Sequence, residues 1–219
     1  MGFTNKLIGI KNDVKKYGFI ESIITDDIIK FNPKQSVLPA KFSYQMFLSP
    51  VTNQYSDPYC VPHSIATWLN WKYNTKHGGV KLDNHIRYSS IYRSKKTQGE
   101  GMTFVEAFNY LKTNGVNTDK GIMKIKDVAF IPNASLMKAA ILANGPIFGA
   151  LPVYDENEDM FWVKKGNTLK ALHAITIVGW DETGYIIRNS WGTSFGNDGY
   201  VVLPYSDANK FRELWTILG

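Results

Sequence analysis

The chain has one cysteine, Cys60, and therefore cannot form an internal disulfide bond. It also has no uninterrupted apolar run long enough for a membrane-spanning helix or for the apolar part of a signal peptide. A secreted protein of 219 residues usually contains several paired cysteines. These absences predict a cytoplasmic protein with no membrane partner.

Acidic residues are fewer than basic ones, 19 against 25, which gives a formal net charge of +6. Proteins that bind nucleic acid usually gather such charge into a stripe or a tail. Here the basic residues are scattered, with short doublets such as Lys95-Lys96 and Lys164-Lys165. We therefore predict a solvated basic surface and no nucleic-acid partner, with attraction to an acidic partner as the alternative.

The chain has no internal repeat and no low-complexity tract. Residues 1–37 form a polar leader with a few apolar clusters, and Asn32-Pro33-Lys34-Gln35 is typical of a turn or linker. Hydrophobic residues make up 44% of the sequence, which is enough for a substantial core. We expect residues 38–219 to form the folded body.

Apolar spacing predicts helices in the first half of the body and strands in the second. Helices are expected from Cys60 through residue 71, with Pro62 in the first turn, and over 103–113 and 135–143. Short β-rich runs separated by Gly and Asp turns follow at 147–153, 174–180, 185–188 and 200–203. This order favours an α+β fold arranged as two lobes.

Cys60 stands at the start of the first expected helix. A lone cysteine is usually a small buried hydrophobic residue, and the cysteine count by itself favours that interpretation. The position favours another one, because the positive end of the helix dipole stabilises a thiolate over a thiol and the thiolate is the nucleophile. Cys60 is therefore our candidate nucleophile.

Four histidines are candidates for the base of this nucleophile: His63, His77, His85 and His173. His63 falls within the helix of Cys60, where we expect a local or surface role, and His77 and His85 lie in polar stretches typical of solvated loops. His173 opens an apolar run over 174–178 that predicts a buried strand. A buried histidine with a purely structural role is the alternative to a catalytic base.

Asn189 follows His173 by sixteen residues, at the end of the next expected strand. A hairpin that turns over 181–184 would bring the two side chains together, so that Asn189 accepts a hydrogen bond from one imidazole nitrogen while the other faces the thiol. Trp191 is expected to cover this bond. Gln54, in a loop six residues before Cys60, is a candidate oxyanion donor together with the backbone N–H of Cys60. An ordinary turn at Asn189 and an ordinary loop residue at Gln54 are the alternatives.

Three segments around these residues form a specific combination. They are Ser49–Gln54 followed by Cys60, the stretch Leu169–Ile175, and the stretch Ile187–Gly192 with its continuation to Tyr200. Together they resemble the papain family of cysteine peptidases, as does the order Gln, Cys, His, Asn. Leu38-Pro39 resembles the usual start of the mature enzyme, and the resemblance covers about residues 38–205.

The resemblance implies a two-lobed fold with the active site in the cleft between a mostly helical lobe (38–140) and a barrel-like antiparallel sheet lobe (141–219). It implies an endopeptidase that works through a thioester acyl-enzyme, in which His173 protonates the leaving amine and then activates water.

The residues Pro58-Tyr59 before Cys60 and Val61-Pro62 after it depart from the family's pattern. The missing disulfides and long propeptide fit an intracellular bacterial, viral or phage relative, located in the cytoplasm, a virion or a host cell. Residues 1–37 are then expected to pack on the body or across the cleft.

The resemblance also assigns residues that bind substrate. An edge that pairs with the substrate backbone is implied at Gly99, Glu100, Gly101 and Met102, for which an ordinary glycine-containing loop is the alternative. Ala150, Ala171 and Ala174 fall at the walls of the second subsite, with Leu172 beside them. These small residues favour a bulky apolar side chain one residue upstream of the cleaved residue, and Glu100 favours basic groups.

Two other functions stay open beside an active peptidase. One is an acyl transferase or amidase that uses the same triad, and the other is a catalytically silent binding protein. The presence of all four polar catalytic residues favours the peptidase. We expect a monomer that acts on protein or peptide substrates without a metal or cofactor, because no metal-ligand cluster or phosphate-cradling loop occurs in the sequence.

Overall fold

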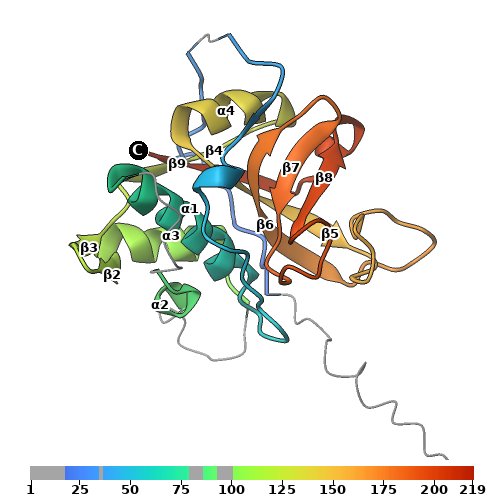
Figure 1. Cartoon of the computed structure of the whole chain (residues 1–219), viewed down its shortest axis with the longest axis horizontal. Coiled ribbons are helices and arrows are strands. Elements are labelled where there is room, and N and C mark those ends of the chain that lie inside the picture. Colours follow the sequence, from blue (N-terminus) through green and yellow to red (C-terminus); the bar gives the residue numbers. More distant parts are fainter. Residues whose placement is uncertain (1–17, 35–36, 79–85, 93–100) are drawn as a thin grey trace, which may run out of the picture.

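The computed structural model describes residues 18–34, 37–78, 86–92 and 101–219. Helices gather on one side of the molecule and a large antiparallel sheet on the other (Figure 1). The helices are α1 (Cys60–Lys76), α2 (Tyr88–Tyr92), α3 (Phe104–Thr113) and α4 (Met137–Asn144). The strands are β1 (Phe42–Ser43), β2 (Val116–Thr118), β3 (Gly121–Met123), β4 (Asp127–Phe130), β5 (Ile147–Val153), β6 (Ala171–Trp180), β7 (Gly184–Arg188), β8 (Tyr200–Pro204) and β9 (Glu213–Leu218). The α+β arrangement in two lobes predicted from the sequence is confirmed.

Helix α1 is the central helix of the molecule. Most of its side chains are buried, the polar His63 and Asn70 among them, because the sheet and the other helices surround it. Pro62 lies in its first turn, where a missing N–H costs no intrahelical hydrogen bond. As a result α1 begins at Cys60, which places the thiol at the helix N-terminus.

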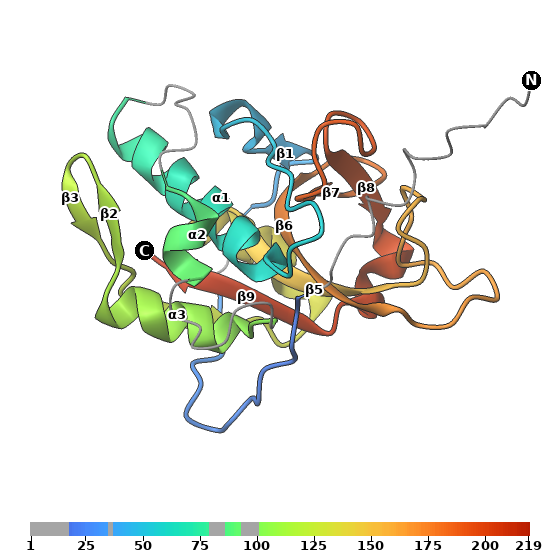
Figure 2. The ribbon, with the colours of Figure 1, turned by 90° about the horizontal axis from the view of Figure 1, so that it is seen from below.

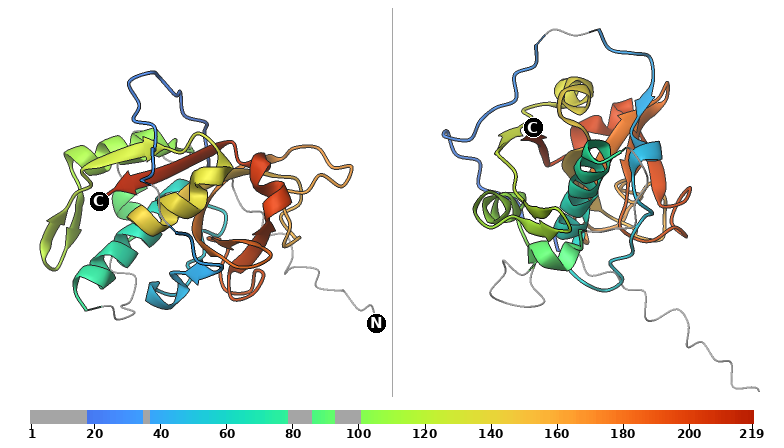
Figure 3. Two further views of the ribbon diagram at one scale, coloured as in Figure 1. Left: turned by 90° about the horizontal axis from the view of Figure 1, so that it is seen from above. Right: turned by 60° about the vertical axis from the view of Figure 1, so that its left-hand side comes forward.

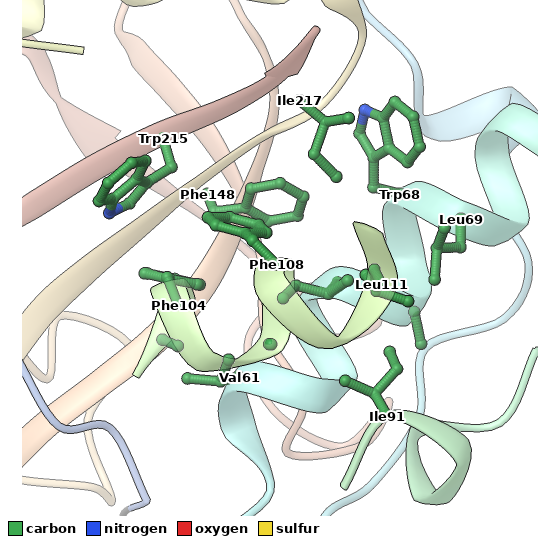
Figure 4. Packing of buried hydrophobic residues seen from close by; sticks show 14 of the residues in the cluster. Val61, Trp68, Leu69, Ile91, Phe104, Phe108, Leu111, Phe148, Trp215 and Ile217 are labelled. Atoms are coloured by element: carbon green, nitrogen blue, oxygen red, sulfur yellow. The ribbon is translucent and has the colours of Figure 1, made fainter. Parts of the chain in front are cut away.

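Helix α3 shows how local sequence determines an element. Thr103 caps its N-terminus through a capping box with Glu106, in which each side chain accepts a hydrogen bond from the backbone N–H of the other residue. The four residues expected to face inward are all buried: Phe104, Ala107, Phe108 and Leu111. They pack with Phe148 and Trp215 of the sheet in the core between the lobes (Figure 4).

The large sheet has the strand order β4-β9-β5-β6-β7-β8, with β1 paired to β6, and all of its pairs are antiparallel. Alternate residues of β5 point to opposite faces. Phe148 and Ala150 belong to the core shared with the helices, whereas Ile147, Leu151 and Val153 belong to a second core within the sheet lobe. The face that carries Phe148 and Ala150 therefore forms one wall of the region between the lobes (Figure 3).

Strands β4 and β9 were not expected from the sequence. They pair with each other, and β9 also pairs with β5, so the large sheet includes residues that precede the lobe boundary expected at 141. Strand β6 begins at Ala171, three residues earlier than expected, because it pairs with β5 along that strand's full length. A 3-10 turn at Ala134–Leu136 precedes α4. Such pairings between distant segments leave little trace in the local pattern.

Residues 18–34 lie along the body of the protein. Phe19 and Phe31 are buried at two anchor points. Phe19 forms a parallel bridge with Met102, and its ring centroid lies 5.2 Å from that of Phe104. The backbone N–H of Phe31 donates to Phe130 of β4 (2.8 Å). Figure 2 shows this blue segment beginning beside β5 and then forming a loop on the side of α3 and β9.

Candidate active site

His173 and Asn189 are brought together by the hairpin of β6 and β7. The strands pair in a register that sets Thr176 opposite Arg188, and the expected turn closes through a hydrogen bond from Asp181 N–H to Gly184. Nε2 of His173 lies 2.7 Å from Oδ1 of Asn189, and both side chains are buried. The same Oδ1 accepts a hydrogen bond from the backbone N–H of Ser190 (2.7 Å). Because an amide oxygen only accepts, Nε2 of His173 carries the proton and Nδ1 carries the lone pair of the neutral ring.

Aromatic rings cover this hydrogen bond. The Trp191 ring stacks on His173 with centroids 4.6 Å apart and an interplanar angle of 27°. Phe161 meets both rings, at 5.8 Å from His173 and 5.0 Å from Trp191, and Phe195 closes the far side of Trp191 at 5.0 Å. Trp191 thus lies where a cover was expected. Phe161 was missed by the sequence analysis, since its loop between β5 and β6 shows no catalytic pattern.

Cys60 lies at the N-terminus of α1 against strand β6, and its side chain is fully buried. Burial raises the pKa of the thiol, while hydrogen bonds from the backbone N–H groups of Ala174, Gly18 and Val61 and from its own N–H act in the opposite direction. The helix terminus alone would favour the thiolate. The pKa rises because burial of the sulfur outweighs these hydrogen bonds.

Gln54, in the loop before Cys60, is fixed by hydrogen bonds at both ends of its side-chain amide. Its Nε2 donates to the carbonyl of Asp57 (2.9 Å), and its Oε1 accepts from the hydroxyl of Ser190 (2.6 Å). Its backbone N–H donates to the Ser190 carbonyl (2.8 Å). The loop before Cys60 is thereby joined to the segment that carries Asn189. No role was expected for Ser190, although it lies within a recognised stretch.

A local or surface role was expected of His63, and the structure shows a local one away from the surface. It is buried, and its Nδ1 lies 2.6 Å from Oγ1 of Thr52, which joins the first turns of α1 to the loop of Gln54. Burial, with smaller contributions from His173 and Arg188, lowers the pKa of His63 to about 3. The ring is therefore neutral near neutral pH. His77 is exposed as expected, and His85 lies outside the described residues.

The residues expected to bind substrate are only partly described. Gly99 and Glu100 lie outside the described residues. Met102 forms the edge of an extended pairing, but its partner here is the chain's own Gly18–Ile20 segment. Ala150 and Ala174 are buried on the wall between the lobes, and Ala171 and Leu172 at the start of β6 are half-buried. Gly101 lies against Gly18, where a Cβ atom would come within 2.4 Å of the Gly18 carbonyl oxygen.

Glu213 is a further residue of this wall that the sequence analysis missed. It pairs with Ala150 in the sheet and is the only buried carboxylate among the described residues. Its carboxylate accepts hydrogen bonds from the backbone N–H of Ser22 and from Nε1 of Trp215 (2.8 Å). One local signal was available, because a glutamate on the same strand face as Trp215 and Ile217 breaks an apolar pattern.

Other kinds of site find less support in the part of the chain that the structure describes. Those residues contain no group of three or more His, Cys, Asp or Glu side chains placed to hold a metal ion. They also contain no helix that is both long and apolar enough to span a bilayer.

Comparison with known proteins shows the family of the chain. Residues 39–212 match the model of the family described as papain family cysteine protease. The chain belongs to the papain family. Xylellain, a cysteine protease from Xylella fastidiosa, has a similar solved structure, with a TM-score of 0.78 and 20% identity over 94% of this chain and 97% of that one. Digestive procathepsin L2 from Tenebrio molitor has a TM-score of 0.74 and 17% identity over 99% and 82% of the two chains. These two likenesses support the fold.

Curated members of the papain family resemble shorter parts of the chain. A gut-specific cysteine proteinase from Caenorhabditis elegans is 40% identical over 85 residues, which are 34% of this chain and 25% of the relative. Cathepsin L from Sarcophaga peregrina is 26% identical over 156 residues, 63% of this chain and 44% of the relative. The chain thus matches less than half of the length of these two relatives.

Proposed function

We propose that this papain-family protein is a cysteine endopeptidase with Cys60 as nucleophile, His173 as base and Asn189 as the residue that orients the base. The observation that carries the proposal is the hydrogen bond of 2.7 Å between Nε2 of His173 and Oδ1 of Asn189. It leaves Nδ1 on the side of the ring away from Asn189, while the backbone N–H of the next residue, Ala174, reaches the sulfur of Cys60. We expect a monomer that acts on protein or peptide substrates.

The reaction follows from these positions. Nδ1 of His173 takes the proton of the Cys60 thiol, and the sulfur adds to the carbonyl carbon of the substrate. The oxygen gains negative charge, which the backbone N–H of Cys60 and the carboxamide of Gln54 stabilise. His173 then gives its proton to the leaving amine as the C–N bond breaks, and a thioester remains. Finally His173 takes a proton from water, the hydroxyl attacks the thioester, and the carboxylic acid and the thiol are released.

In the proposed resting state, residues 18–22 block the cleft. Met102 N–H donates to the Gly18 carbonyl (2.6 Å), and Ile20 N–H donates to the Met102 carbonyl (3.2 Å). Phe19 belongs to the same buried cluster as Cys60, Ala150 and Ala174. A substrate that is to pair with Met102 must first displace this segment, so we regard it as an inhibitory leader.

A direct test uses the purified chain and a fluorogenic peptide library. We expect hydrolysis to appear after limited removal of the leader, and Cys60→Ala to abolish it. Asn189→Ala should keep the fold, as judged by thermal unfolding, and lower kcat by about 10- to 100-fold because the imidazole loses its fixed orientation. Transfer of the acyl group to an added amine, with little hydrolysis, would instead support an acyl transferase. An alkylation rate of Cys60 equal to that of a free thiol, with no turnover, would support a silent binding protein.

A further inference from the structure

A groove of about 340 Å³ lies at the end of α1 that is remote from Cys60. The C-terminal half of α1 forms one side, the β2–β3 hairpin with the chain that follows it forms another, and the end of β9 lies between them (Figure 3). Lys72 and Lys76 line it and follow Cys60 by twelve and sixteen residues. At a rise of about 1.5 Å per residue these positions are roughly 18–24 Å from the nucleophile along the helix. The groove is therefore separate from the active site.

The groove, which we call the lysine groove, is lined by side chains of one charge sign. Its lining residues include no aspartate and no glutamate, but they include His77 and five lysines, namely Lys72, Lys76, Lys120, Lys124 and Lys126. Lys124 donates to the carbonyl of Thr113, and Nζ of Lys120 lies 3.7 Å from Asp119. Lys72, Lys76 and Lys126 form no ion pair with any described residue. Such a cluster of like charges carries an electrostatic cost and produces a positive potential in a concave site.

Some lysines elsewhere on the described surface are paired with carboxylates. Lys112, Lys165, Lys170 and Lys210 each form an ion pair with an acidic side chain. Lys72, by contrast, extends over aromatic rings, with Nζ 5.8 Å from the Trp68 centroid and 6.0 Å from that of Trp71. Asp119 lies at the edge of the lysine groove, where it pairs with Lys120 and accepts from the Tyr73 hydroxyl. Lys72, Lys76 and Lys126 have no such carboxylate partner among the described side chains, and these three charges face the groove.

The walls of the lysine groove are partly apolar. Ile122 is exposed and Met123 is half-buried at its edge, beside the buried side chains of Trp68, Tyr73, Ile125 and Ile217. Positive charge beside an apolar wall suits an acidic peptide that carries a large apolar side chain. A single-stranded nucleic acid suits it less, because such ligands need exposed aromatic faces for stacking and the rings here are buried.

We propose that the lysine groove is an exosite that binds an acidic segment of the protein substrate, remote from the bond to be cleaved. This inference rests on the proposed peptidase function. An extended chain covers about 3.3 Å per residue, so the acidic segment lies at least roughly six residues from the scissile bond. The exosite selects substrates by position and charge, and it acts on binding rather than on the chemical step.

The first experiment measures binding alone. A fluorescein-labelled peptide with several glutamates around one leucine is titrated with the Cys60→Ala chain, beside a peptide with glutamine in place of each glutamate. Lys120→Glu/Lys126→Glu should weaken binding of the glutamate peptide by about tenfold or more. The matched control, Lys41→Glu/Lys164→Glu, makes the same change of net charge at exposed positions outside the groove and should leave the affinity nearly unchanged.

The second experiment measures turnover. A short peptide and the same peptide extended by the acidic segment are compared as substrates of the leader-free enzyme. The groove variant should raise KM for the extended peptide by about tenfold and leave kcat and the short peptide unaffected. Raising the salt concentration should remove the advantage of the extended peptide in the unsubstituted enzyme.

Several results would overturn the proposal. They are equal weakening by the groove and control variants, equal affinity for the glutamate and glutamine peptides, and tighter binding of an oligothymidylate or of phosphatidylserine vesicles than of the acidic peptide. Failure of the proposed function is a distinct result, because the enzyme would then cleave neither substrate while the binding experiment still reported on the groove.

Discussion

The backbone N–H of Met102 donates to the carbonyl oxygen of Gly18 over 2.6 Å, directly beside the catalytic helix. Gly18 fits there only because it lacks a side chain, since a Cβ atom would lie 1.9 Å from the carbonyl oxygen of Pro58. Pro58, which departs from the family's pattern before Cys60, thus forms part of the surface on which Gly18 packs. Gly18 also reaches the Cys60 thiol, whose pKa is raised by burial, while the hydrogen bond from Gly18 acts in the opposite direction.

Gly18→Ala should therefore activate the full-length chain. The added methyl group cannot be accommodated against Pro58, so the leader must leave its position and the cleft opens. We expect the initial rate on a small peptide, and the rate of Cys60 alkylation by iodoacetamide, to rise by about tenfold or more. The control is Glu21→Ala, which removes an exposed side chain from the same segment. Equal rates for both variants and the unsubstituted chain would show that the segment does not limit access.

His63 makes stability depend on pH. Its pKa in the folded protein is about 3, below the ordinary value of 6.5, because burial disfavours the charged ring. Below pH 6.5 the unfolded chain takes up a proton at His63 and the folded chain does not. The contribution of His63 to the free energy of unfolding is therefore complete above pH 6.5 and is lost progressively as the pH falls toward 3. Within that window the free energy of unfolding should fall by up to about 1.4 kcal/mol per pH unit.

The measurement is urea unfolding at several pH values in a Cys60→Ala background, which prevents self-digestion. His63→Phe keeps a buried aromatic ring but cannot titrate, so the difference between the two proteins should decrease as the pH falls. The loss of the Thr52 contact adds only a constant offset. A difference that stays constant from neutral to acidic pH would contradict a neutral buried His63.

Glu213 should change the substrate preference expected from the sequence. The alanines expected at the second subsite favour an apolar side chain, but Glu213 is the strand partner of Ala150 and places a carboxylate on the same wall. Departure of the leader removes the Ser22 N–H from this carboxylate, which can then accept a hydrogen bond from a cationic side chain. We expect efficient cleavage of peptides with arginine one residue upstream of the cleaved residue.

Glu213→Gln tests this preference with little change of shape, because the amide oxygen still accepts from Trp215. Activity on the arginine peptide should fall by roughly 10- to 100-fold, the value of a hydrogen bond to a charged group, and activity on the matching leucine peptide should persist. A parallel fall for both peptides would mean that Glu213 only supports the fold.

The parts of the site that could be predicted lie at the ends of regular elements with strong local patterns. Cys60 precedes a clear helical pattern, and His173 and Asn189 flank a hairpin whose turn is visible in the sequence. The burial of His63 and the position of Glu213 could not be predicted in this way. Each depends on packing between remote segments, and the contact between Ser22 and Glu213 spans 191 residues. No local periodicity reports such a contact.

The contact between Ser190 and Gln54 leads to a prediction about the oxyanion site. The Ser190 hydroxyl donates to Oε1 of Gln54 over 2.6 Å and so turns the carboxamide nitrogen toward the Asp57 carbonyl. Gln54→Ala removes a donor to the developing oxyanion and should lower kcat by about 10²- to 10³-fold. Ser190→Ala only frees the carboxamide to rotate, so we expect a smaller fall in kcat with little change in KM.

A double-mutant cycle separates this positioning role from a general effect on packing. If Ser190 acts through Gln54, Ser190→Ala should have no further effect once Gln54 is alanine, and the double variant should match Gln54→Ala alone. Thermal unfolding of all three variants shows whether the fold is kept. Additive losses of kcat in the cycle would mean that the Ser190 hydroxyl acts independently of Gln54, because alanine keeps the backbone N–H that residue 190 donates to Asn189.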